Sequence, residues 1–336
     1  MAETILVTGG CGFIGTNFVR RMLDKHDYTV INFDKLTYAG NLENLKDIEG
    51  HPRYHFVRGD IASGPDVMSV FEKPIDIVVN FAAESHVDRS IIDPDAFIKT
   101  NINGTFNLLE VAKKKGIQRF VQISTDEVYG SLGQNGAFRE DTPLSPNSPY
   151  SASKTAADIL AMAYFKTYGM PIIITRCSNN YGPYQFPEKL IPLIITNALA
   201  DKELPVYGDG LNVRDWIHVE DHCAAIDLVM HKGKVGNVYN IGASNEKTNI
   251  EIVKLVLEIL GKPESLIRYV TDRPGHDRRY AIDSGKITRE LGYGPSVNFA
   301  EGMRSTVEWF VKNTGWWERI KTGAYLDYYE KMYGDR

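Results

Sequence analysis

Two adjacent carboxylates and a Tyr/Lys pair are the residues of this sequence that could do chemistry together. Asp126 and Glu127 follow Thr125 at the end of an apolar run, 23 residues (150 − 127) ahead of Tyr150. Tyr150 and Lys154 are four apart, so on a helix they share one face. A carboxylate can remove a proton, a carboxylic acid can give one, and a tyrosine can act as a base where an ammonium and an oxidised nicotinamide ring lower its pKa. These residue types predict an enzyme that both oxidises and eliminates.

The direct adjacency of Asp126 and Glu127 affects their protonation. Two carboxyl groups in a closed pocket resist simultaneous ionisation, so the pKa of one is raised while the other stays charged. Such a pair supplies one acid and one base, although coupled sites share their titration and the assignment stays open. The alternative is a solvated Asp-Glu turn.

A glycine-rich stretch, residues 9–15, follows the first apolar run and precedes a segment of helical period. Gly9 permits a tight turn, Gly12 lets the backbone approach a pyrophosphate, and Gly15 lets the helix pack on the sheet. Phosphate groups bind well at the start of such a helix. An ordinary turn is the alternative, but the flanking strand and helix favour a dinucleotide site.

Residues after the next two predicted strands support that site. Asp34 ends the second strand, where a carboxylate accepts hydrogen bonds from the adenosine ribose and repels a 2′-phosphate, so NAD is favoured over NADP. The adjacent Lys35 weakens this preference a little. Asp60 and Ile61, just after the third strand, could hold the adenine ring; for Asp60 the alternative is a simple loop aspartate.

Short β-branched runs alternate with longer segments of helical period, which indicates a parallel sheet with crossover helices. The expected fold class is α/β, a Rossmann-type doubly wound parallel sheet with a smaller, loop-rich C-terminal substrate lobe. The predicted strands cover residues 4–8, 29–33, 54–57, 76–81, 120–124 and 171–176. The predicted helices cover residues 13–25, 65–71, 94–115 and 151–168, with Gly116 and Gly169 as C-terminal stops.

The composition changes after Cys177 to Asn, Gly, Pro and aromatic residues. We therefore expect residues 1–177 to form the NAD-binding domain and residues 178–336 to form mainly the nucleotide-sugar lobe. The stretch 216–242 could return to the main sheet, because 216–230 has helical period and 238–241 reads as a strand. Long helices often pair across a twofold axis, so we expect a homodimer.

Charge and composition exclude several partners. The 336 residues carry a net charge of −5, so no broad basic surface for nucleic acid or anionic membranes is expected. No apolar run of about 18 residues appears and the start lacks the basic segment of a signal peptide, which indicates the cytoplasm. The three cysteines are widely spaced, so no disulfide framework is expected. No metal is expected either, because no second donor lies at metal-ligand spacing from His51, His55, His222 or His231.

Several motifs together resemble one known family. The glycine stretch, Phe81-Ala82-Ala83, the Tyr150/Lys154 spacing and Asn179-x-Tyr181-Gly182-Pro183 are similar to the extended short-chain dehydrogenase/reductase family, in its nucleotide-sugar branch. Thr125-Asp126-Glu127 and the stretches 36–41, 83–90, 177–192 and 272–280 resemble the 4,6-dehydratases of that branch that act on dTDP-glucose. The resemblance spans nearly the whole chain.

This resemblance implies an NAD-dependent hydro-lyase that converts dTDP-glucose to dTDP-4-keto-6-deoxy-glucose, as in deoxysugar and rhamnose biosynthesis. Tyr150 would take the C4 hydroxyl proton. Thr125 would hydrogen-bond the same oxygen, and Lys154 would bind the nicotinamide ribose. The C4 ketone acidifies the C5 proton, so Glu127 would remove it as the base while Asp126 protonates the C6 hydroxyl as the acid. Hydride then returns to C6, so NAD would stay tightly bound and be recycled in each turnover.

The motifs and the resemblance together give two sets of binding residues. The cofactor set is Gly9, Gly12, Phe13, Ile14, Gly15, Asp34, Lys35, Leu36, Thr37, Asp60, Ile61, Phe81, Ala82, Ala83, Ser85, Thr100, Tyr150, Lys154 and Asn180. The substrate set is Ser85, Thr125, Asn179, Glu188, Lys189, Leu190, Pro205, Tyr207, Arg214, Asn249, Arg273 and His276. Arg214 and Arg273 suit phosphate because the guanidinium fork is bidentate, and Tyr207 offers a base a flat apolar face.

Some of these residues have structural alternatives. A salt bridge to Asp215 or Asp209 is the alternative for Arg214, and a place in the core is the alternative for Tyr207. We expect Arg278 and Arg279 to pair with internal carboxylates instead of phosphate.

Two other functions stay open. A related nucleotide-sugar enzyme, such as a 4-epimerase, a decarboxylase or a UDP-sugar 4,6-dehydratase, would keep the glycine stretch and the Tyr150/Lys154 pair, and the first two need no carboxyl pair at 126 and 127. A non-catalytic dinucleotide-binding sensor belongs to a different class. The sequence does not identify the nucleotide base.

Overall fold

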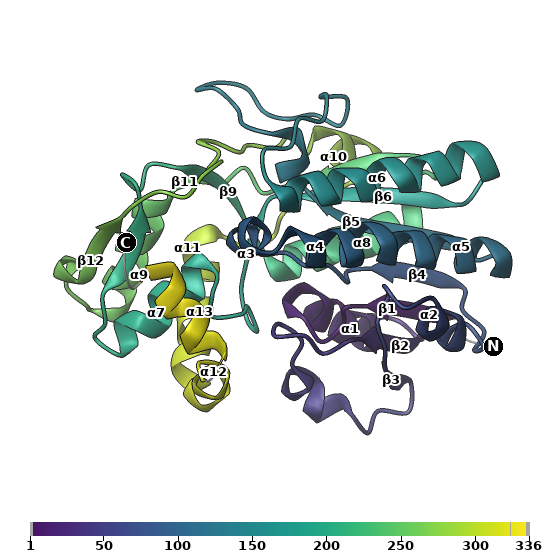
Figure 1. The fold of residues 1–336 in the computed structure, drawn as a ribbon, viewed down its shortest axis with the longest axis horizontal. Coiled ribbons are helices and arrows are strands. Elements are labelled where there is room, and N and C mark those ends of the chain that lie inside the picture. Colours follow the sequence, from purple (N-terminus) through teal and green to yellow (C-terminus); the bar gives the residue numbers. More distant parts are fainter. Residues whose placement is uncertain (1–2, 323, 334–336) are drawn as a thin grey trace.

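A seven-stranded parallel sheet forms the core of the larger part of the molecule (Figure 1), in a computed structural model that describes residues 3–322 and 324–333. Its strand order is β10-β6-β5-β4-β1-β2-β3. The strands are β1 (Thr4–Thr8), β2 (Thr29–Asp34), β3 (Tyr54–Arg58), β4 (Ile77–Asn80), β5 (Arg119–Thr125), β6 (Ile172–Cys177) and β10 (Val238–Ile241). The order reverses between β1 and β4, which is where doubly wound sheets bind ligands. The predicted α/β, doubly wound class is confirmed.

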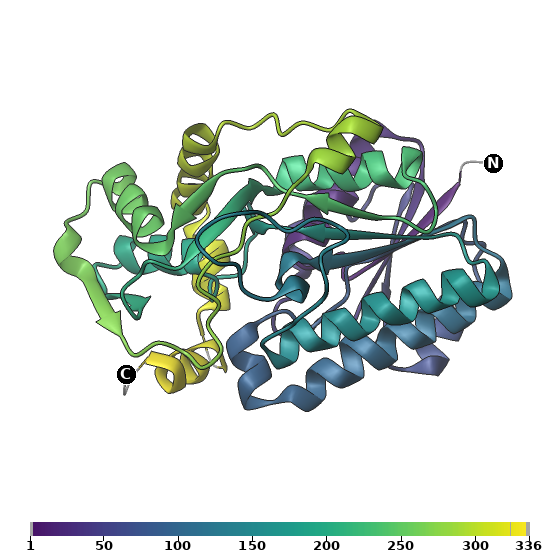
Figure 2. The same cartoon turned by 90° about the horizontal axis from the view of Figure 1, so that it is seen from above.

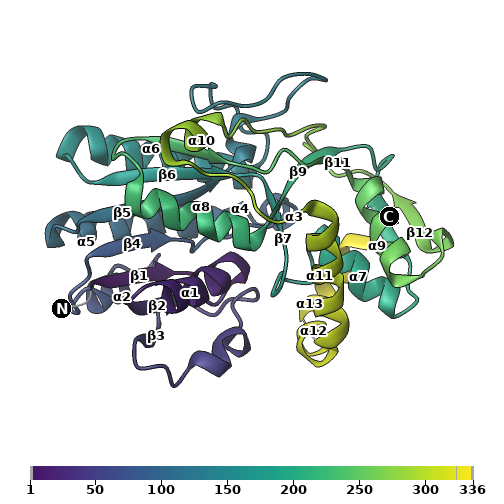
Figure 3. The same ribbon diagram turned by 180° about the vertical axis from the view of Figure 1, so that it is seen from behind.

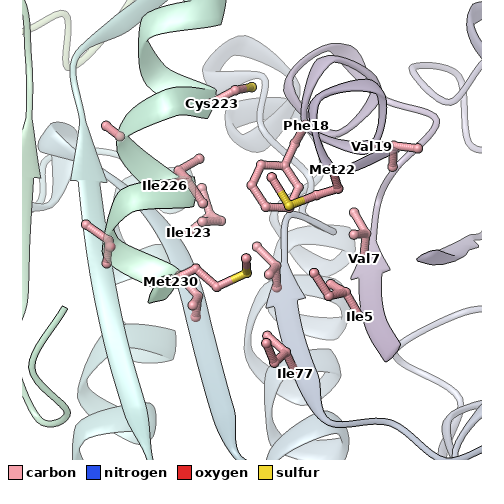
Figure 4. Close-up of a cluster of buried hydrophobic side chains, with 14 of the residues drawn as sticks. Ile5, Val7, Phe18, Val19, Met22, Ile77, Ile123, Cys223, Ile226 and Met230 are labelled. Carbon is pink, nitrogen blue, oxygen red and sulfur yellow. The ribbon is translucent and has the colours of Figure 1, made fainter. Parts of the chain in front are cut away.

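Helices cover both faces of this sheet, because successive strand side chains point to opposite faces. On one face lie α1 (Phe13–Lys25), α8 (Val219–Lys232) and α10 (Gly285–Leu291), the near side in Figure 3. Figure 4 shows Phe18 and Met22 of α1 facing Ile226 and Met230 of α8 across the core. The other face is covered by α2 (Gly64–Val70), α5 (Thr105–Lys115) and α6 (Pro149–Tyr168), of which α5 and α6 run side by side in Figure 2.

The helix predicted for residues 94–115 contains a π-helical turn in the structure. It follows α3 (Val87–Ile92) and consists of α4 (Pro94–Phe97), a π-helical turn η2 (Ile98–Gly104) and α5. The wide turn lets the buried Asn101 side chain bind both backbone groups of Glu84, at 2.9 and 3.0 Å, and the Ser153 hydroxyl at 2.8 Å. Such turns are frequent at functional sites. The helix predicted for residues 94–115 is therefore found with those bounds, and the helix stops at Gly116 and Gly169 are found as well, both in the left-handed conformation.

A smaller lobe lies beside the carboxyl ends of the strands (Figures 1 and 3). It contains a three-stranded sheet, β7 (Asn179–Tyr181), β9 (Val213–His218) and β11 (Glu246–Thr248), and a pair, β8 (Leu204–Tyr207) with β12 (Ile267–Val270). Its helices are α7 (Leu190–Leu199), α9 (Asn249–Leu260), α11 (Phe299–Lys312), α12 (Thr314–Ile320) and α13 (Ala324–Tyr333). Three short 3₁₀ turns, η1 (Leu42–Ile48), η3 (Asp126–Tyr129) and η4 (Glu264–Leu266), complete the described elements.

The chain crosses between the two parts more than once. The helix predicted for residues 216–230 begins later, at Val219, because Trp216, Ile217 and His218 end strand β9 of the smaller lobe. The following α8 and β10 join the main sheet, and so does α10, whose Ile287 lies in the core beside α8. None of the helices in the described ranges has the length and apolarity needed to cross a membrane.

Candidate active site

A cleft opens along the carboxyl ends of β1 to β6, and residues 177–180, 185, 186, 188 and 189 also line it. Of the predicted cofactor set, all members but Leu36 line it: Gly9, Gly12, Phe13, Ile14, Gly15, Asp34, Lys35, Thr37, Asp60, Ile61, Phe81, Ala82, Ala83, Ser85, Thr100, Tyr150, Lys154 and Asn180. Leu36 instead packs its side chain against the core beneath α1, from a backbone with φ of 59°.

The glycine turn has the geometry that a dinucleotide needs. Gly9 has φ of 70°, and a Cβ there would lie 2.7 Å from the Ala82 nitrogen. A Cβ on Gly15 would lie 2.2 Å from the Gly9 carbonyl oxygen. Gly12 is the N-cap of α1 and provides no side-chain cap, so the first N–H groups of the helix stay available to an anion.

Asp34 lines the cleft at the end where the sequence predicts the adenosine. Its two carboxylate oxygens accept the Cys11 and Leu36 N–H groups at 2.9 and 2.8 Å, and burial raises its pKa. Each oxygen keeps a second lone pair for a ribose hydroxyl. Lys35, the one feature that favoured NADP, is paired with Asp60 at 2.7 Å. The ammonium is thus already neutralised, which strengthens the preference for an unphosphorylated ribose.

The carboxyl pair lies at the end of β5, in the short turn η3. Asp126 is 2% exposed, and its Oδ2 has no hydrogen-bond partner among the described residues. Burial raises the pKa of Asp126 well above its usual value, and the charges of Glu127 and Asp215 raise it further. Burial also raises the pKa of Glu127, but Arg273, Arg214 and Lys189 oppose that rise. The two neighbours therefore differ in environment: burial and two anions favour the protonated form of Asp126, while three cations favour the charged form of Glu127.

Tyr150 and Lys154 share the face of α6 that meets this pair, and both are buried. The Lys154 ammonium donates to the Ile123 carbonyl oxygen at 2.6 Å. Burial raises the pKa of Tyr150 well above its usual value and Glu127 raises it further, whereas a hydrogen bond with Thr125 lowers it. The predicted lowering of the Tyr150 pKa is therefore not found in the protein alone, because the Lys154 charge is turned towards the backbone of β5.

Cationic groups of the smaller lobe face the carboxyl pair. Arg273 pairs with Asp88 at 3.1 Å, and the Tyr207 hydroxyl donates to the same carboxylate at 3.1 Å. The ring of Tyr207 lies 6.1 Å from that of His276, edge to face. The structure thus brings Arg273, Tyr207 and His276 together on the lobe side, although they do not line the cleft itself.

Arg214 is fixed by carbonyl oxygens. It donates to Val213 and Asp277 at 2.7 and 2.9 Å, and its guanidinium lies 4.4 Å from the Tyr280 ring centre. The alternative of a salt bridge to Asp215 or Asp209 is wrong: Asp209 pairs with Arg278 at 2.8 Å, and Asp215 accepts from backbone N–H groups. The expected pairing of Arg278 and Arg279 with internal carboxylates is confirmed, the latter with Glu246 at 2.7 Å.

The remaining substrate residues divide into two groups. Those that line the cleft are Ser85, Thr125, Asn179, Glu188 and Lys189. Leu190, Pro205 and Asn249 do not: Leu190 packs in the core of the smaller lobe, Pro205 faces a separate hollow against α13, and Asn249 begins α9.

Several residues that line the cleft belong to neither of the two predicted binding sets. They include Tyr38, Glu84, Ser124, Ser178, Gln185 and Phe186. Gln185 is the most informative, because its Nε2 donates to the Asn180 carbonyl at 2.9 Å while its buried Oε1 has no partner among the described residues. Its position in the Asn-, Gly- and Pro-rich run after Cys177 was the available signal.

One group of possible metal ligands occurs among the described residues, far along the sheet from the cleft. His26, Asp227 and His231 place three ligand atoms together, so the expectation that His231 has no second donor at ligand spacing was wrong. However, His231 Nδ1 lies 2.8 Å from the Asp227 carbonyl oxygen, which requires a proton on that nitrogen, and Arg21 pairs with the Asp227 carboxylate at 2.8 Å. A protonated nitrogen is not a metal ligand. We therefore describe this group as a hydrogen-bonded cluster, and the absence of a metal stays a prediction.

Comparison with known proteins adds to this geometry. The GDP-mannose 4,6 dehydratase family model matches residues 6–306. The dTDP-glucose 4,6-dehydratase of Xanthomonas campestris pv. campestris (strain B100) is 52% identical, over 96% of this chain and 97% of its own. The chain belongs to the dTDP-glucose 4,6-dehydratase family.

Solved structures of this family agree with that assignment. The dTDP-glucose 4,6-dehydratase from Bacillus anthracis str. Ames, in complex with NAD, is 56% identical with a TM-score of 0.89, covering 95% of this chain and 100% of that one. DesIV, the dTDP-glucose 4,6-dehydratase from Streptomyces venezuelae with NAD and TYD bound, is 51% identical with a TM-score of 0.93, at the same coverage. The predicted resemblance to the dTDP-glucose 4,6-dehydratase family is confirmed.

Proposed function

We propose that this chain dehydrates dTDP-glucose to dTDP-4-keto-6-deoxy-glucose as an NAD-dependent hydro-lyase. The observation that carries the proposal is the buried Asp126/Glu127 pair in the same cleft as Tyr150 and Lys154. A dinucleotide oxidoreductase needs only the second pair, whereas the elimination of water also needs an acid and a base. Family membership supports the same reaction.

NAD fits the adenosine and pyrophosphate ends of the cleft. Asp34 and the neutralised Lys35 favour a free 2′-hydroxyl, and the crowded glycine turn leaves room for a pyrophosphate and for no side chain. Bound there, the dinucleotide supplies a hydride acceptor for the sugar C4 and a hydride donor for C6. Because the same molecule serves both transfers, we propose that it stays bound through the turnover.

The residues of the chain would act in a fixed order. Tyr150, hydrogen-bonded with Thr125, takes the proton of the C4 hydroxyl. The pKa of Tyr150 must fall before it can do so. The positive charge of an oxidised nicotinamide, with its ribose held by Lys154, would lower that pKa. Glu127 then removes the C5 proton, and Asp126 protonates the departing C6 hydroxyl. The unpartnered Oδ2 of Asp126 is the oxygen that is free to do so.

The environments of the two carboxyls support this division of roles. An acid must be protonated, and burial together with two neighbouring anions favours that form of Asp126. A base must be charged, and Arg273, Arg214 and Lys189 favour that form of Glu127. The same three cations would also bind the substrate diphosphate, because phosphate groups are recognised by such cationic side chains.

Product analysis tests the proposal. Purified protein incubated with dTDP-glucose should give a product with the alkali-labile absorbance of a 4-keto-6-deoxy sugar, and parallel UDP- and CDP-glucose reactions establish base preference. An epimerase or a decarboxylase would give product without that absorbance. A non-catalytic sensor would give no product at all, and either result would overturn the proposal.

We also propose that the chain works as a cytoplasmic homodimer. Exposed apolar side chains gather along α3, η2, α5 and α6, among them Ile91, Ile98, Phe106 and Ile159, each more than 40% exposed. A twofold pairing of these helices would cover them in a four-helix arrangement. Sedimentation analysis should give a dimer, and Phe106→Glu with Ile159→Glu should give a monomer. A monomeric wild type would contradict this.

A further inference from the structure

His222 is a buried histidine that the proposed chemistry does not use. It lies in the first turns of α8, is 0% exposed, and has its Nδ1 2.9 Å from the side-chain oxygen of Asn180. Asn180 lines the cleft. A polar side chain in such a position, touching the wall of the cleft from behind, can act only through that wall.

The hydrogen bonds around Asn180 determine which nitrogen of His222 carries the proton. The Asn180 amide nitrogen donates to the Ser178 carbonyl oxygen at 3.0 Å, so the amide oxygen must face His222. An amide oxygen only accepts, so Nδ1 of His222 is the donor. The other nitrogen, Nε2, is then a bare lone pair, and it has no partner among the described residues. Burial lowers the pKa of His222 to about 3, so the ring stays neutral at working pH.

A buried ring nitrogen without a hydrogen-bond partner costs free energy, and an apolar side chain at this position would not have that cost. Among the residues that the structure describes, the contact with Asn180 is therefore the polar interaction through which the ring can act. That contact fixes the rotation of the Asn180 amide, so that both ends of the amide are engaged.

The same asparagine anchors a longer segment. Gln185 donates to the Asn180 carbonyl oxygen at 2.9 Å, and Asn17 of α1 donates to the Pro183 carbonyl oxygen at 3.2 Å. Cys177, Ser178, Asn179, Asn180 and Gln185 all line the cleft. The backbone of β7, in the middle of this wall, is paired with β9, and His222 adds the contact that holds the Asn180 side chain.

The position of this wall identifies the part of the ligand that it meets. The pyrophosphate belongs at the start of α1, and the adenosine belongs beside Asp34, at one end of the cleft. The other end, beside Tyr150 and Lys154, is therefore the nicotinamide end. The 177–185 wall lines that end, because Cys177 is the last residue of β6 and its thiol approaches the Ser124 carbonyl oxygen of β5 at 3.5 Å.

We infer that His222 is a positioning residue, which locks the Asn180 amide on the wall that retains the nicotinamide half of the dinucleotide between the two hydride transfers. The importance of retaining NAD rests on the proposed function, because loss of the reduced cofactor in mid-turnover leaves the enzyme inactive. The hydrogen bond itself is independent of that function.

Three substitutions separate positioning from core filling. An asparagine at 222 can place its amide nitrogen where Nδ1 lies and so keep the hydrogen bond to Asn180. A glutamine places its amide nitrogen where Nε2 lies, and a leucine has similar bulk but no donor. We expect His222→Leu and His222→Gln to exchange bound NAD about tenfold faster than wild type, equivalent to about 1.4 kcal/mol. His222→Asn should stay close to wild type. Progress curves of the first two should decline with time and recover on addition of free NAD.

Several results would overturn the inference. Equal NAD exchange in wild type and His222→Leu would show that the residue only fills space, and His222→Asn behaving like His222→Gln would show that Nδ1 is not the working atom. Should the variants fail to fold, ¹⁵N-histidine NMR of the wild type decides: a neutral Nδ1–H ring is expected, and an Nε2–H ring would contradict the argument. A wild type that exchanges NAD as expected but makes no 4-keto product would defeat the proposed function and leave the positioning role intact.

Discussion

Arg273 of the smaller lobe and Asp88 at the start of α3 form an ion pair of 3.1 Å that joins the lobe to the dinucleotide-binding part. Asp88 is 3% exposed and also accepts a hydrogen bond from Tyr207. One buried carboxylate therefore orients both the arginine expected to meet the diphosphate and the ring expected to meet the base. The Nε of Arg273 has no partner among the described residues, so the guanidinium keeps a donor for an incoming phosphate.

Replacing Arg273 by lysine tests this arrangement. The charge is kept, but a lysine ammonium lacks the planar fork with which an arginine can hold Asp88 and a phosphate together. We expect the KM for dTDP-glucose to rise about tenfold or more, because a charge-assisted hydrogen bond contributes roughly 1.5–3 kcal/mol, with a smaller change in kcat. Arg278→Lys is the matched control, since Arg278 lies in the same loop and pairs with the exposed Asp209. Equal KM values for the two variants would contradict the role.

Tyr150→Phe should abolish most of the turnover and leave the cofactor in place. The substitution removes the proton acceptor for the C4 hydroxyl, and general acid–base catalysis contributes about 10²- to 10⁴-fold. The ring still fills its place against Phe97, 6.2 Å away, so NAD retention should be unchanged. Steady-state rates and the NAD content of the purified protein measure the two effects. Tyr168→Phe, on the exposed end of the same helix, is the control; near-normal activity of Tyr150→Phe would refute its role.

The carboxyl pair predicts how activity depends on pH. The pKa of both groups is raised, Asp126 more strongly. The base works only when charged, so the rate should fall as the pH drops through the pKa of Glu127. The acid works only when protonated, so the rate should fall again as the pH rises through the pKa of Asp126. The resulting bell-shaped profile of kcat reports macroscopic values of the coupled pair.

Variants of the pair should separate oxidation from elimination. Asp126→Asn and Glu127→Gln keep the size of each side chain but remove its proton transfer, while Tyr150 and Lys154 can still support the first step. We expect both variants to accumulate reduced cofactor, seen as nicotinamide absorbance that follows addition of dTDP-glucose. Wild type should show almost none. Full turnover in either variant would exclude that residue as the acid or the base.

The parts of the fold that could be predicted are those in which local pattern and tertiary structure agree. The first helix and its glycine turn obey their own periodicity and packing, and the structure has α1 at Phe13–Lys25 as predicted. The π turn at residues 98–104 could not be read, because it depends on Asn101 reaching Glu84 in a different segment. The return of α10 to the main core likewise depends on contacts 60 residues away in the chain, between Ile287 and α8.

The candidate site follows the same rule. Residues on the strand ends were predictable, since parallel strands deliver them to one edge. Leu36 and Leu190 do not line the cleft although Thr37 and Lys189 beside them do, because a motif gives proximity in sequence without side-chain direction. His222 could not have been linked to Asn180 either, because a helix and a strand 42 residues apart meet only in the folded chain.

The largest loss in the free energy of unfolding is predicted for a buried ion pair behind the active site. Arg176 of β6 donates to Asp158 of α6 at 2.9 Å, with side chains 5% and 1% exposed, and the same guanidinium donates to the Tyr129 hydroxyl at 3.0 Å. Asp158→Asn would leave the arginine charge buried and unpaired, which costs about 3–5 kcal/mol. Glu110→Gln is the control, since Glu110 and Lys113 form a half-exposed pair that contributes less than about 1 kcal/mol. Denaturant unfolding of the holoenzyme measures both, and a loss in Asp158→Asn no larger than in Glu110→Gln would show that water or a neighbouring group compensates the arginine.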